Sequence, residues 1–264
     1  MTLRVTLLGT GTSTGVPRIA CDCAVCTSTD PRNRRLRAGV RIDVLGEAGG
    51  GGEPRGTVLV DTSPDLRQQA LAHDLRRVDA VLFTHAHADH VHGLDDLRVF
   101  NFLQRSAIPL YGSAATLGAV RRSFAYAWEE GQEGGGKPLL ELVPVDGPFE
   151  LLGRRVEPLP VWHGELEVTA WRIGRFALVT DVSAIPEASK ARLRGLDLLV
   201  LGALRYRPHP THFSVAEAVE VARELGARHT VLTHLAHEVD ATAPEVELPP
   251  EVELGWDGMR FEVG

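Results

Sequence analysis

The segment from His85 to His90 constrains this chain most, because it holds three histidines and one aspartate in six residues. It follows an apolar run at residues 78–83 that has the character of a buried strand. Alternate residues of an extended chain point the same way, so His85 and His87 can hold one ion. The chain must then turn, which lets Asp89 and His90 face a second ion. Imidazole and carboxylate groups suit zinc, so the segment predicts a metal centre rather than a solvated histidine-rich loop.

Length and composition fit a folded domain without an unusual partner. The 264 residues, 44% of them hydrophobic, suit one α/β domain over residues 1–264, and no linker interrupts them. A net charge of -7 argues against a broad nucleic-acid surface. No apolar run approaches the roughly 18 residues of a membrane helix. Residues 1–8 resemble a first strand, with no signal-peptide cleavage pattern. We therefore expect a cytoplasmic protein with no membrane or nucleic-acid partner.

The three cysteines, Cys21, Cys23 and Cys26, lie within six residues. An odd, clustered set is a poor disulfide framework, and it indicates a thiolate metal site instead. Three thiolates leave tetrahedral zinc one ligand short, so a histidine is expected to complete a small zinc-binding loop near residues 21–26. The alternative is a redox-active or simply buried group.

Alternating strand-like and helix-like segments predict the α/β class. Strands are expected at 3–8, 40–44, 57–60, 78–83, 108–111, 140–143, 149–152, 156–160, 168–173, 176–180, 196–201 and 229–232, and helices at 64–73, 93–105, 115–128, 186–193 and 214–225. Helix 214–225 carries a capping box, with Ser214 as N-cap and Glu217 three residues later. Two predicted buried strands lead to an aspartate through similar sequences, at residues 59–62 and 178–181. This similarity hints at two related halves.

Several loops allow more than one interpretation. The glycine-rich turn at 9–15 is reminiscent of a dinucleotide loop, but cysteines follow where a helix should start, so we expect it to let backbone approach the metal site. The basic segment 34–37 is expected to be a solvated face, and 46–52 a flexible hairpin loop. Residues 124–137 join three aromatic residues to a glycine run, which predicts either a packed helix with a surface loop or a lid over the metals.

Three further residues of ligand type lie just past predicted strands: His163, Asp181 and His234. Loops after neighbouring strands converge on one rim of a sheet, so we expect these residues to meet the histidine motif. Two metal ions roughly 3.5–4 Å apart can activate water and clamp a phosphate. His163 alone would be interpreted as a core residue, but its partners favour a ligand. The expected first set is His85, His87 and His163, the second set is Asp89, His90 and His234, and Asp181 bridges them.

With these motifs in place, the sequence resembles the metallo-β-lactamase superfamily, and within it the phosphoribosyl 1,2-cyclic phosphodiesterase family. The matching pieces are Gly9-Thr10-Gly11, Gly15-Val16-Pro17, the three cysteines, residues 85–90, Thr180-Asp181, Thr233-His234-x-x-His237 and Trp256-Asp257-Gly258-Met259. The resemblance implies a four-layer αβ/βα sandwich, two active-site Zn²⁺ or Mn²⁺ ions and a small cyclic phosphate ester as substrate. It also implies a structural zinc held by Cys21, Cys23, Cys26 and His237, and it suggests a homodimer.

The resemblance further implies a general acid between Asp181 and His234, acting with the carboxylates Asp181 and Asp89. His209 and His212 both lie in that interval, and His212 fits better because it directly precedes the capped helix. Asp61 is expected to orient the ligands. The arginines at positions 205 and 207 could bind phosphate or simply lie on the surface.

Three other functions remain open. A tRNA 3′-end nuclease shares this metal centre but carries a long basic arm, which is not evident here. A carboxylic ester, thioester or lactam hydrolase uses similar metals. A non-enzymatic metal-dependent interaction protein is the alternative of another class, although such relatives lose metal ligands and this chain keeps a full set.

Overall fold

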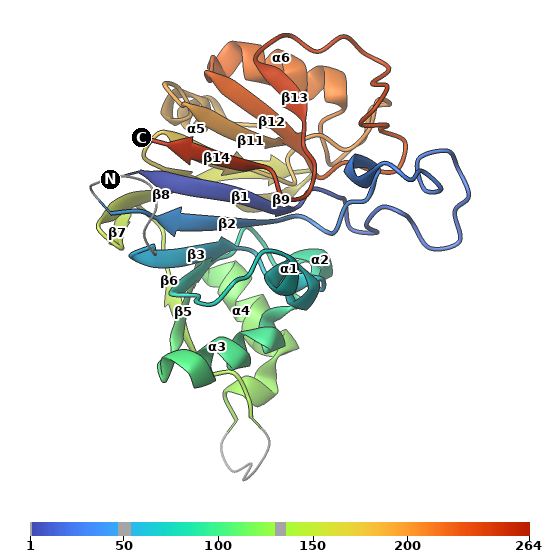
Figure 1. The fold of residues 1–264 in the computed structure, drawn as a ribbon. Coiled ribbons are helices and arrows are strands. Elements are labelled where there is room, and N and C mark those ends of the chain that lie inside the picture. Colours follow the sequence, from blue (N-terminus) through green and yellow to red (C-terminus); the bar gives the residue numbers. More distant parts are fainter. Residues whose placement is uncertain (1, 47–53, 130–135) are drawn as a thin grey trace.

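The computed structural model describes residues 2–46, 54–129 and 136–264, and within them two seven-stranded sheets lie face to face (Figure 1). The first sheet has the order β14 (Arg260–Val263), β1 (Leu3–Gly9), β2 (Gly39–Val44), β3 (Gly56–Val60), β4 (Ala80–Leu82), β5 (Ile108–Gly112) and β6 (Leu140–Pro144). The second has the order β13 (Val252–Leu254), β12 (His229–Thr233), β11 (Leu198–Gly202), β10 (Phe176–Val179), β9 (Leu166–Ile173), β8 (Arg154–His163) and β7 (Phe149–Leu151).

Helices cover the outer face of each sheet (Figure 1). The first sheet packs against α1 (Leu66–Ala72), α3 (Leu97–Gln104) and α4 (Ala114–Ser123), and the second against α5 (Glu187–Arg192) and α6 (Val215–Leu225). A third apolar cluster lies between the sheets and joins Ile42 and Val60 of one to Trp171 and Phe176 of the other. The expected four-layer αβ/βα sandwich is therefore confirmed.

Parallel pairing brings the loops of each sheet to one edge. Strands β3 to β6 are mutually parallel, and so are β10 to β13. In each sheet the first parallel strand, β3 or β10, pairs antiparallel with the strand before it. All residues of β3 and β10 are buried, as expected for strands covered on both faces. The two aspartate-delivering strands thus hold equivalent places, in line with the hint of two related halves.

Most predicted elements are present, with instructive exceptions. The helix expected at 115–128 ends at Ser123, because Phe124 leaves helical geometry to bury its ring, and the 3-10 helix η3 (Ala125–Ala127) follows. The helix expected at 93–105 is divided into the 3-10 helix η2 (Leu94–Asp96) and α3. The sequence analysis missed β13 and β14, which are too short to show a period. Of the hairpin loop expected at 46–52, residues 47–52 lie outside the described residues.

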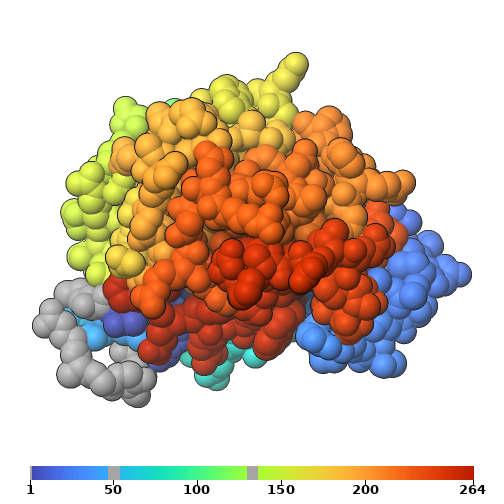
Figure 2. All heavy atoms as spheres, turned by 90° about the horizontal axis from the view of Figure 1, so that it is seen from above, coloured from blue at the N-terminus to red at the C-terminus, as the bar shows by residue number. Residues whose placement is uncertain are grey.

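A long arm between β1 and β2 leaves the sheets and stands beside the segment that follows β12 (Figures 1 and 2). It carries the cysteines and the 3-10 helix η1 (Pro31–Asn33). Inside the arm Val16 pairs with Arg35, and at its base Gly11 pairs with Leu235. The expectation that residues 34–37 form a solvated face is wrong for Arg35, which is 1% exposed.

Among the described residues, none of the helices combines the length and apolar character that a bilayer crossing requires.

Candidate metal centre

Two groups of ligand-type side chains meet at the edge of the sheets and share Asp181. Within each group, one nitrogen or oxygen per residue lies within 4.8 Å of all the others. The first group is His85, His87, His163 and Asp181, and the second is Asp89, His90, Asp181 and His234. The seven residues that the sequence analysis selected therefore lie together, in the two predicted sets.

Each residue is delivered by the end of a regular element. His85 and His87 lie between β4 and the short helix α2 (Ala88–Val91), which carries Asp89 and His90. His163 is the last residue of β8, Asp181 follows β10 after one intervening residue, and His234 directly follows β12. Asp181 and His234 adopt positive φ angles of 54° and 61°, as does Asp61 after β3 at 62°. Non-glycine residues rarely adopt this conformation, and such strain gathers at functional sites.

The spacing of these atoms fits metal ions. His90 Nε2 lies 3.3 Å from Asp89 Oδ2 and 3.3 Å from Asp181 Oδ1, and His234 Nε2 also lies 3.3 Å from Asp181 Oδ1. Ligands about 2.1 Å from a tetrahedral ion stand about 3.4 Å apart. The Nε2 atoms of His85, His90 and His234 are buried without a hydrogen-bond partner, although buried polar atoms are normally paired. Cations between these atoms would supply the missing partner.

The far ring nitrogens of three histidines are held by the protein. His90 Nδ1 donates to Asp61 Oδ2 at 2.7 Å, and His163 Nδ1 donates to the Thr211 carbonyl at 2.7 Å. His85 Nδ1 lies 3.0 Å from the Thr84 hydroxyl, which itself donates to Asp61. These contacts leave the Nε2 atoms free to face the centre, an arrangement typical of metal-ligating histidines. Asp61 thus lies where the sequence predicted an orienting residue.

Thr84 and Thr211 were missed by the sequence analysis. Thr84 directly precedes the motif, but a threonine in that place carries no signal of its own. Thr211 binds His163 through its backbone carbonyl, so the identity of its side chain gives no indication of this contact.

The charges of the centre favour a cation. Burial opposes charge on His90, but the Asp181 and Asp61 carboxylates outweigh it and raise its pKa well above the usual value. Burial, followed by the neighbouring His90, lowers the pKa of His85 well below the usual value. Burial also works against the Asp181 carboxylate, yet His234 and His90 hold its pKa well below the ordinary value. Buried carboxylates therefore attract positive charge, which metal ions supply when they displace protons.

A second ligand cluster lies in the arm. One sulfur or nitrogen atom from each of Cys21, Cys23, Cys26 and His237 lies within 4.8 Å of the others, and the cysteines form no disulfide. His237 Nδ1 stands 3.5 Å from the Cys21 sulfur and 3.3 Å from the Cys23 sulfur. Burial raises the pKa of Cys26 to about 11, so this thiol is protonated near pH 7, and a bound metal ion would favour the thiolate. Three sulfurs and one imidazole at these distances fit a tetrahedral zinc ion.

Comparison with known proteins identifies the family. Residues 56–235 match the model described as the beta-lactamase superfamily domain. The crystal structure titled as a new diphosphatase from the PhnP family is 40% identical, with a TM-score of 0.87 over 98% of this chain and 97% of that one. The chain belongs to the metallo-β-lactamase superfamily. The resemblance to this superfamily drawn from the motifs is thereby confirmed, and within it the chain is similar to a member of the PhnP family.

Two curated relatives carry other names. The octanoyltransferase of Porphyromonas gingivalis is 38% identical over 98% of this chain, which spans only 51% of the length of that relative. The ribonuclease Z of Myxococcus xanthus is 31% identical over 70% of this chain and 81% of that protein. This branch of the metallo-β-lactamase superfamily therefore includes proteins named for different reactions.

His212 lies against both groups of the metallo-β-lactamase centre. Its ring is 5.0 Å from the His234 ring, nearly parallel to it, and 4.5 Å from the His163 ring. His209 lies beyond it, 5.2 Å away between rings, and its Nδ1 accepts from Thr211. Of the two candidate general acids, His212 is therefore the one adjoining the ligands. Burial, followed by His234, lowers the pKa of His212 to about 3, so the ring is neutral near pH 7 in the free protein.

The two arginines of the same loop serve its structure. Arg205 donates to the carbonyls of Arg207 and Pro208 at 3.3 and 3.2 Å. The Arg207 guanidinium stands 3.8 Å from Glu238 on the neighbouring loop. These contacts favour the interpretation of both side chains as surface residues that shape the His209–His212 loop.

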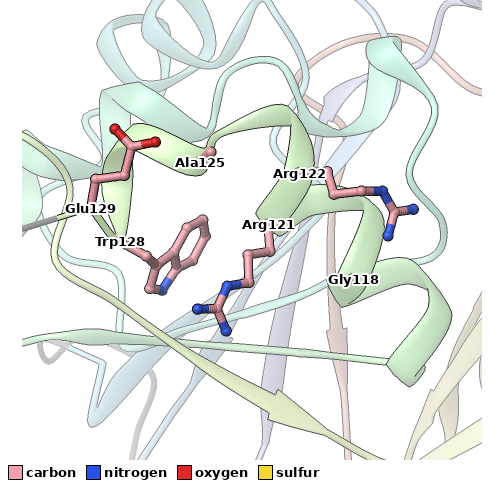
Figure 3. Close-up of a pocket in the computed structure, with 6 residues that line it drawn as sticks. All are labelled: Gly118, Arg121, Arg122, Ala125, Trp128 and Glu129. Carbon is pink, nitrogen blue, oxygen red and sulfur yellow. The ribbon is translucent and has the colours of Figure 1, made fainter.

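A hollow of about 490 Å³, shown in Figure 3, shares no lining residue with the ligand clusters. It is lined by Gly118, Arg121, Arg122, Ala125, Trp128 and Glu129. Arg121 and Arg122 occupy the last turn of α4, where positive charge suits the helix dipole.

Residues 124–129 of the predicted lid pack against the helices that follow the histidine motif. Phe124 meets the His92 ring edge to face at 5.8 Å, and the Tyr126 hydroxyl donates to Asp95. For this part the packed-helix interpretation fits better, whereas 130–135 lie outside the described residues.

Proposed function

We propose that this protein is a metal-dependent hydrolase that cleaves small phosphoric diesters or diphosphates. The observation that carries the proposal is the position of Asp181, which joins two ligand groups in which the Nε2 atoms of His85, His90 and His234 are buried without a hydrogen-bond partner. The 40% identity to a diphosphatase of the PhnP family supports phosphoryl chemistry. Phosphoribosyl 1,2-cyclic phosphate, the substrate type implied by the motifs, and a substituted diphosphate both present a P–O bond to such a site.

In this proposal two Zn²⁺ or Mn²⁺ ions are held by the two ligand groups, and a structural Zn²⁺ by the cysteine cluster. When bound to the two groups that share Asp181, the ions would act as Lewis acids, which lower the pKa of bound water and neutralise charge on the phosphoryl oxygens. Asp61 keeps the His90 ring oriented, and the Thr211 carbonyl does the same for His163. The protein itself therefore fixes the direction of the ligand atoms before an ion arrives.

His212 is the proposed proton donor. Hydrolysis consumes one water, whose oxygen forms a new bond to phosphorus while the bond to the leaving oxygen breaks. The leaving oxygen takes up a proton. The His212 ring lies against His163 of one ligand group and His234 of the other, so it is placed to donate that proton. The His212 ring is neutral in the free protein, so it must become protonated before it can act as an acid. Binding of the anionic substrate favours this, because a nearby negative charge stabilises the imidazolium form.

The experiment that tests the proposal compares wild-type protein with Asp181→Ala after loading with Mn²⁺ or Zn²⁺. The substrates are bis(p-nitrophenyl) phosphate, a cyclic ribose phosphate and a substituted diphosphate. We expect the wild type to hydrolyse at least one and Asp181→Ala to lose metal and activity together. Asp197→Ala is the matched control, since Asp197 pairs with Arg175 at the surface. Equal rates for the wild type and Asp181→Ala would refute the assigned centre.

A second candidate is an RNA 3′-processing nuclease, favoured by the 31% identity to a ribonuclease Z. The net charge of -7 weighs against it, because tRNA binding needs a positive surface. Precursor tRNA belongs in the same assay, with an octanoyl thioester to represent the ester and thioester hydrolases. A higher kcat/KM for either than for the small phosphate compounds would replace the proposed substrate class.

A further inference from the structure

One short loop carries a ligand candidate of both clusters. His234 belongs to the Asp181-centred group and His237, three residues later, to the cysteine cluster. Both follow β12 directly. Any change in how His237 is held therefore reaches His234 through only two intervening residues.

The part of the loop next to His234 is fixed by backbone hydrogen bonds. Leu235 donates to the Thr10 carbonyl at 2.8 Å and accepts from the Thr12 amide at 3.2 Å. Ala236 donates to the Leu204 carbonyl at 2.8 Å. The loop is thus tied to the base of the arm on one side and to the end of β11 on the other.

Around His237 the loop is held by the Arg35 side chain. The guanidinium donates to the Val239 carbonyl at 2.9 Å and to the Ala236 carbonyl at 3.4 Å, on either side of His237. It also donates to Asn33 Oδ1 at 3.3 Å, and Asn33 binds Asp240 and the Ala241 amide. Loss of this side chain would remove a hydrogen bond from the carbonyl on each side of His237 and leave only the backbone bonds of the loop.

The same arginine is anchored in the cysteine arm. Its backbone exchanges hydrogen bonds of 2.8 and 2.7 Å with Val16. Val16 in turn packs with Val25 and Cys26 in a small apolar cluster. Arg35 therefore connects the chain segment that presents the thiolates to the loop that presents both histidines.

Burying this guanidinium is costly, which calls for a physical reason. Arg35 is 1% exposed and its Nε has no hydrogen-bond partner. The Asp257 and Asp240 carboxylates favour its charge, but burial outweighs them and lowers the pKa of Arg35. An apolar side chain would avoid that cost. A zinc ion with three thiolates and one imidazole carries a net charge of -1, which a buried cation beside His237 offsets.

We propose that Arg35 is a positioning residue that couples the two clusters. Metal at the cysteine cluster fixes His237, Arg35 holds the loop around it, and the imidazole of His234 is thereby kept in place for the Asp181-centred group. The inference rests on the metal assignment of the proposed function, and it makes the affinity of one site depend on occupancy of the other.

A double-mutant cycle tests this coupling without relying on activity. Co²⁺ is titrated into wild type, Cys23→Ser, Arg35→Met and the double variant. Its visible absorption reports the imidazole and carboxylate centre, and the thiolate charge-transfer band reports the cysteine cluster. We expect Cys23→Ser to weaken Co²⁺ at the Asp181-centred site about 10–100-fold in the wild-type background, the range typical of lost support around ligands. In the Arg35→Met background the same change should have little further effect.

Three variants guard the interpretation. Arg34→Met is the matched control, because Arg34 is exposed and donates only to the Ser28 carbonyl at 3.5 Å. Arg35→Lys should restore part of the coupling. Its ammonium group can bind one carbonyl of the loop, but it cannot bind the Ala236 and Val239 carbonyls together as the planar guanidinium does. Asn33→Ala replaces Arg35→Met in the cycle if that protein does not fold, because it removes one acceptor without leaving a cavity for a whole arginine.

The outcomes separate two failures. No Co²⁺ at the Asp181-centred site of the wild type would overturn the proposed function itself. Binding that Cys23→Ser leaves unchanged would overturn the coupling alone. Additive effects of Cys23→Ser and Arg35→Met would show that Arg35 is not the link, and would overturn its assigned role.

Discussion

Asp61 accepts three hydrogen bonds at the point where β3 ends. They come from the Thr84 amide at 2.8 Å, the Thr84 hydroxyl at 2.8 Å and His90 Nδ1 at 2.7 Å. A carboxylate accepts all of them, whereas an amide must turn its own N–H groups toward one of these donors. The orienting role of Asp61 was predictable because this aspartate directly follows an apolar strand. Packing alone would not favour a charged residue at such a position.

Asp61→Asn should therefore weaken metal binding strongly, with a moderate loss of unfolding free energy. We expect about 10–100-fold weaker metal binding at the Asp181-centred site and about 1–3 kcal/mol of unfolding free energy lost. Metal titration and urea denaturation measure the two effects. Asp43→Asn is the control, since Asp43 in β2 is an equally buried carboxylate that binds Arg41 of the same strand and Thr57 of β3. Equal metal loss in both variants would contradict the orienting role.

The two histidines of the 209–212 loop should differ sharply. We expect His212→Gln to lower kcat about 10²–10⁴-fold, the usual contribution of a positioned acid, with metal content unchanged. His209→Gln should change kcat by less than about tenfold, because the His209 ring lies beyond His212. Steady-state kinetics on the best substrate of the panel decide between them. A greater loss from His209→Gln would move the acid to that residue.

At the scale of elements, prediction succeeded where a local signal exists. The capping box of α6 is present, with the Ser214 hydroxyl and the Glu217 carboxylate satisfying each other's backbone amides. The end of α4 was mistaken because its break follows from burial of Phe124 against another helix, which no local pattern records. Strands β13 and β14 depend on their partners in the sheets rather than on their three or four residues.

Ser214→Ala should cost about 1 kcal/mol of unfolding free energy, because the Glu217 amide at the start of α6 loses its partner, the Ser214 hydroxyl. Ser123→Ala, in an exposed position at the end of α4, should stay within about 0.5 kcal/mol of the wild type. Urea denaturation of both variants checks this difference. Equal stabilities would mean that the cap contributes nothing to α6.

At the scale of the whole molecule, Asp257 ties the C-terminal segment to both ends of the arm. Its carboxylate accepts from the Thr10 amide and hydroxyl at 2.8 Å and from the Leu36 amide at 2.7 Å. Burial outweighs these donors and raises the pKa of Asp257 to about 6. The terminal motif was recognised as a family feature, but its contacts cross more than 200 residues and could not be predicted from spacing.

This raised pKa makes stability depend on pH. The folded carboxyl keeps its proton to higher pH than the unfolded one, so its stabilising effect is present below pH 3.8 and is lost as the pH rises through 6. Asn in its place has no such titration. The stability difference between wild type and Asp257→Asn should therefore shift by about 2 kcal/mol against the wild type from pH 4 to pH 7. Urea denaturation across this range measures it, with Asp197→Asn, at a partly exposed position, as control. A difference independent of pH would contradict the assignment.

The sequence analysis located the seven residues of the centre but not the contacts that hold them. His163, Asp181 and His234 could be selected because each is a polar group closing an apolar strand, which is a local property. Arg35 was taken for a solvated side chain, because its neighbours in sequence are basic and its burial is decided by the loop after β12. Sequence thus predicts which groups do the chemistry better than it predicts what supports them.

Each of the two ligand sets draws two residues from the first half of the chain and two from the second. On the proposed metal assignment, neither half of the chain supplies more than two of the four ligand candidates of either set, so each complete set forms only when the two halves have docked. Ions offered before that point would meet incomplete sets, and the metal content of the protein would then depend on the supply present after folding.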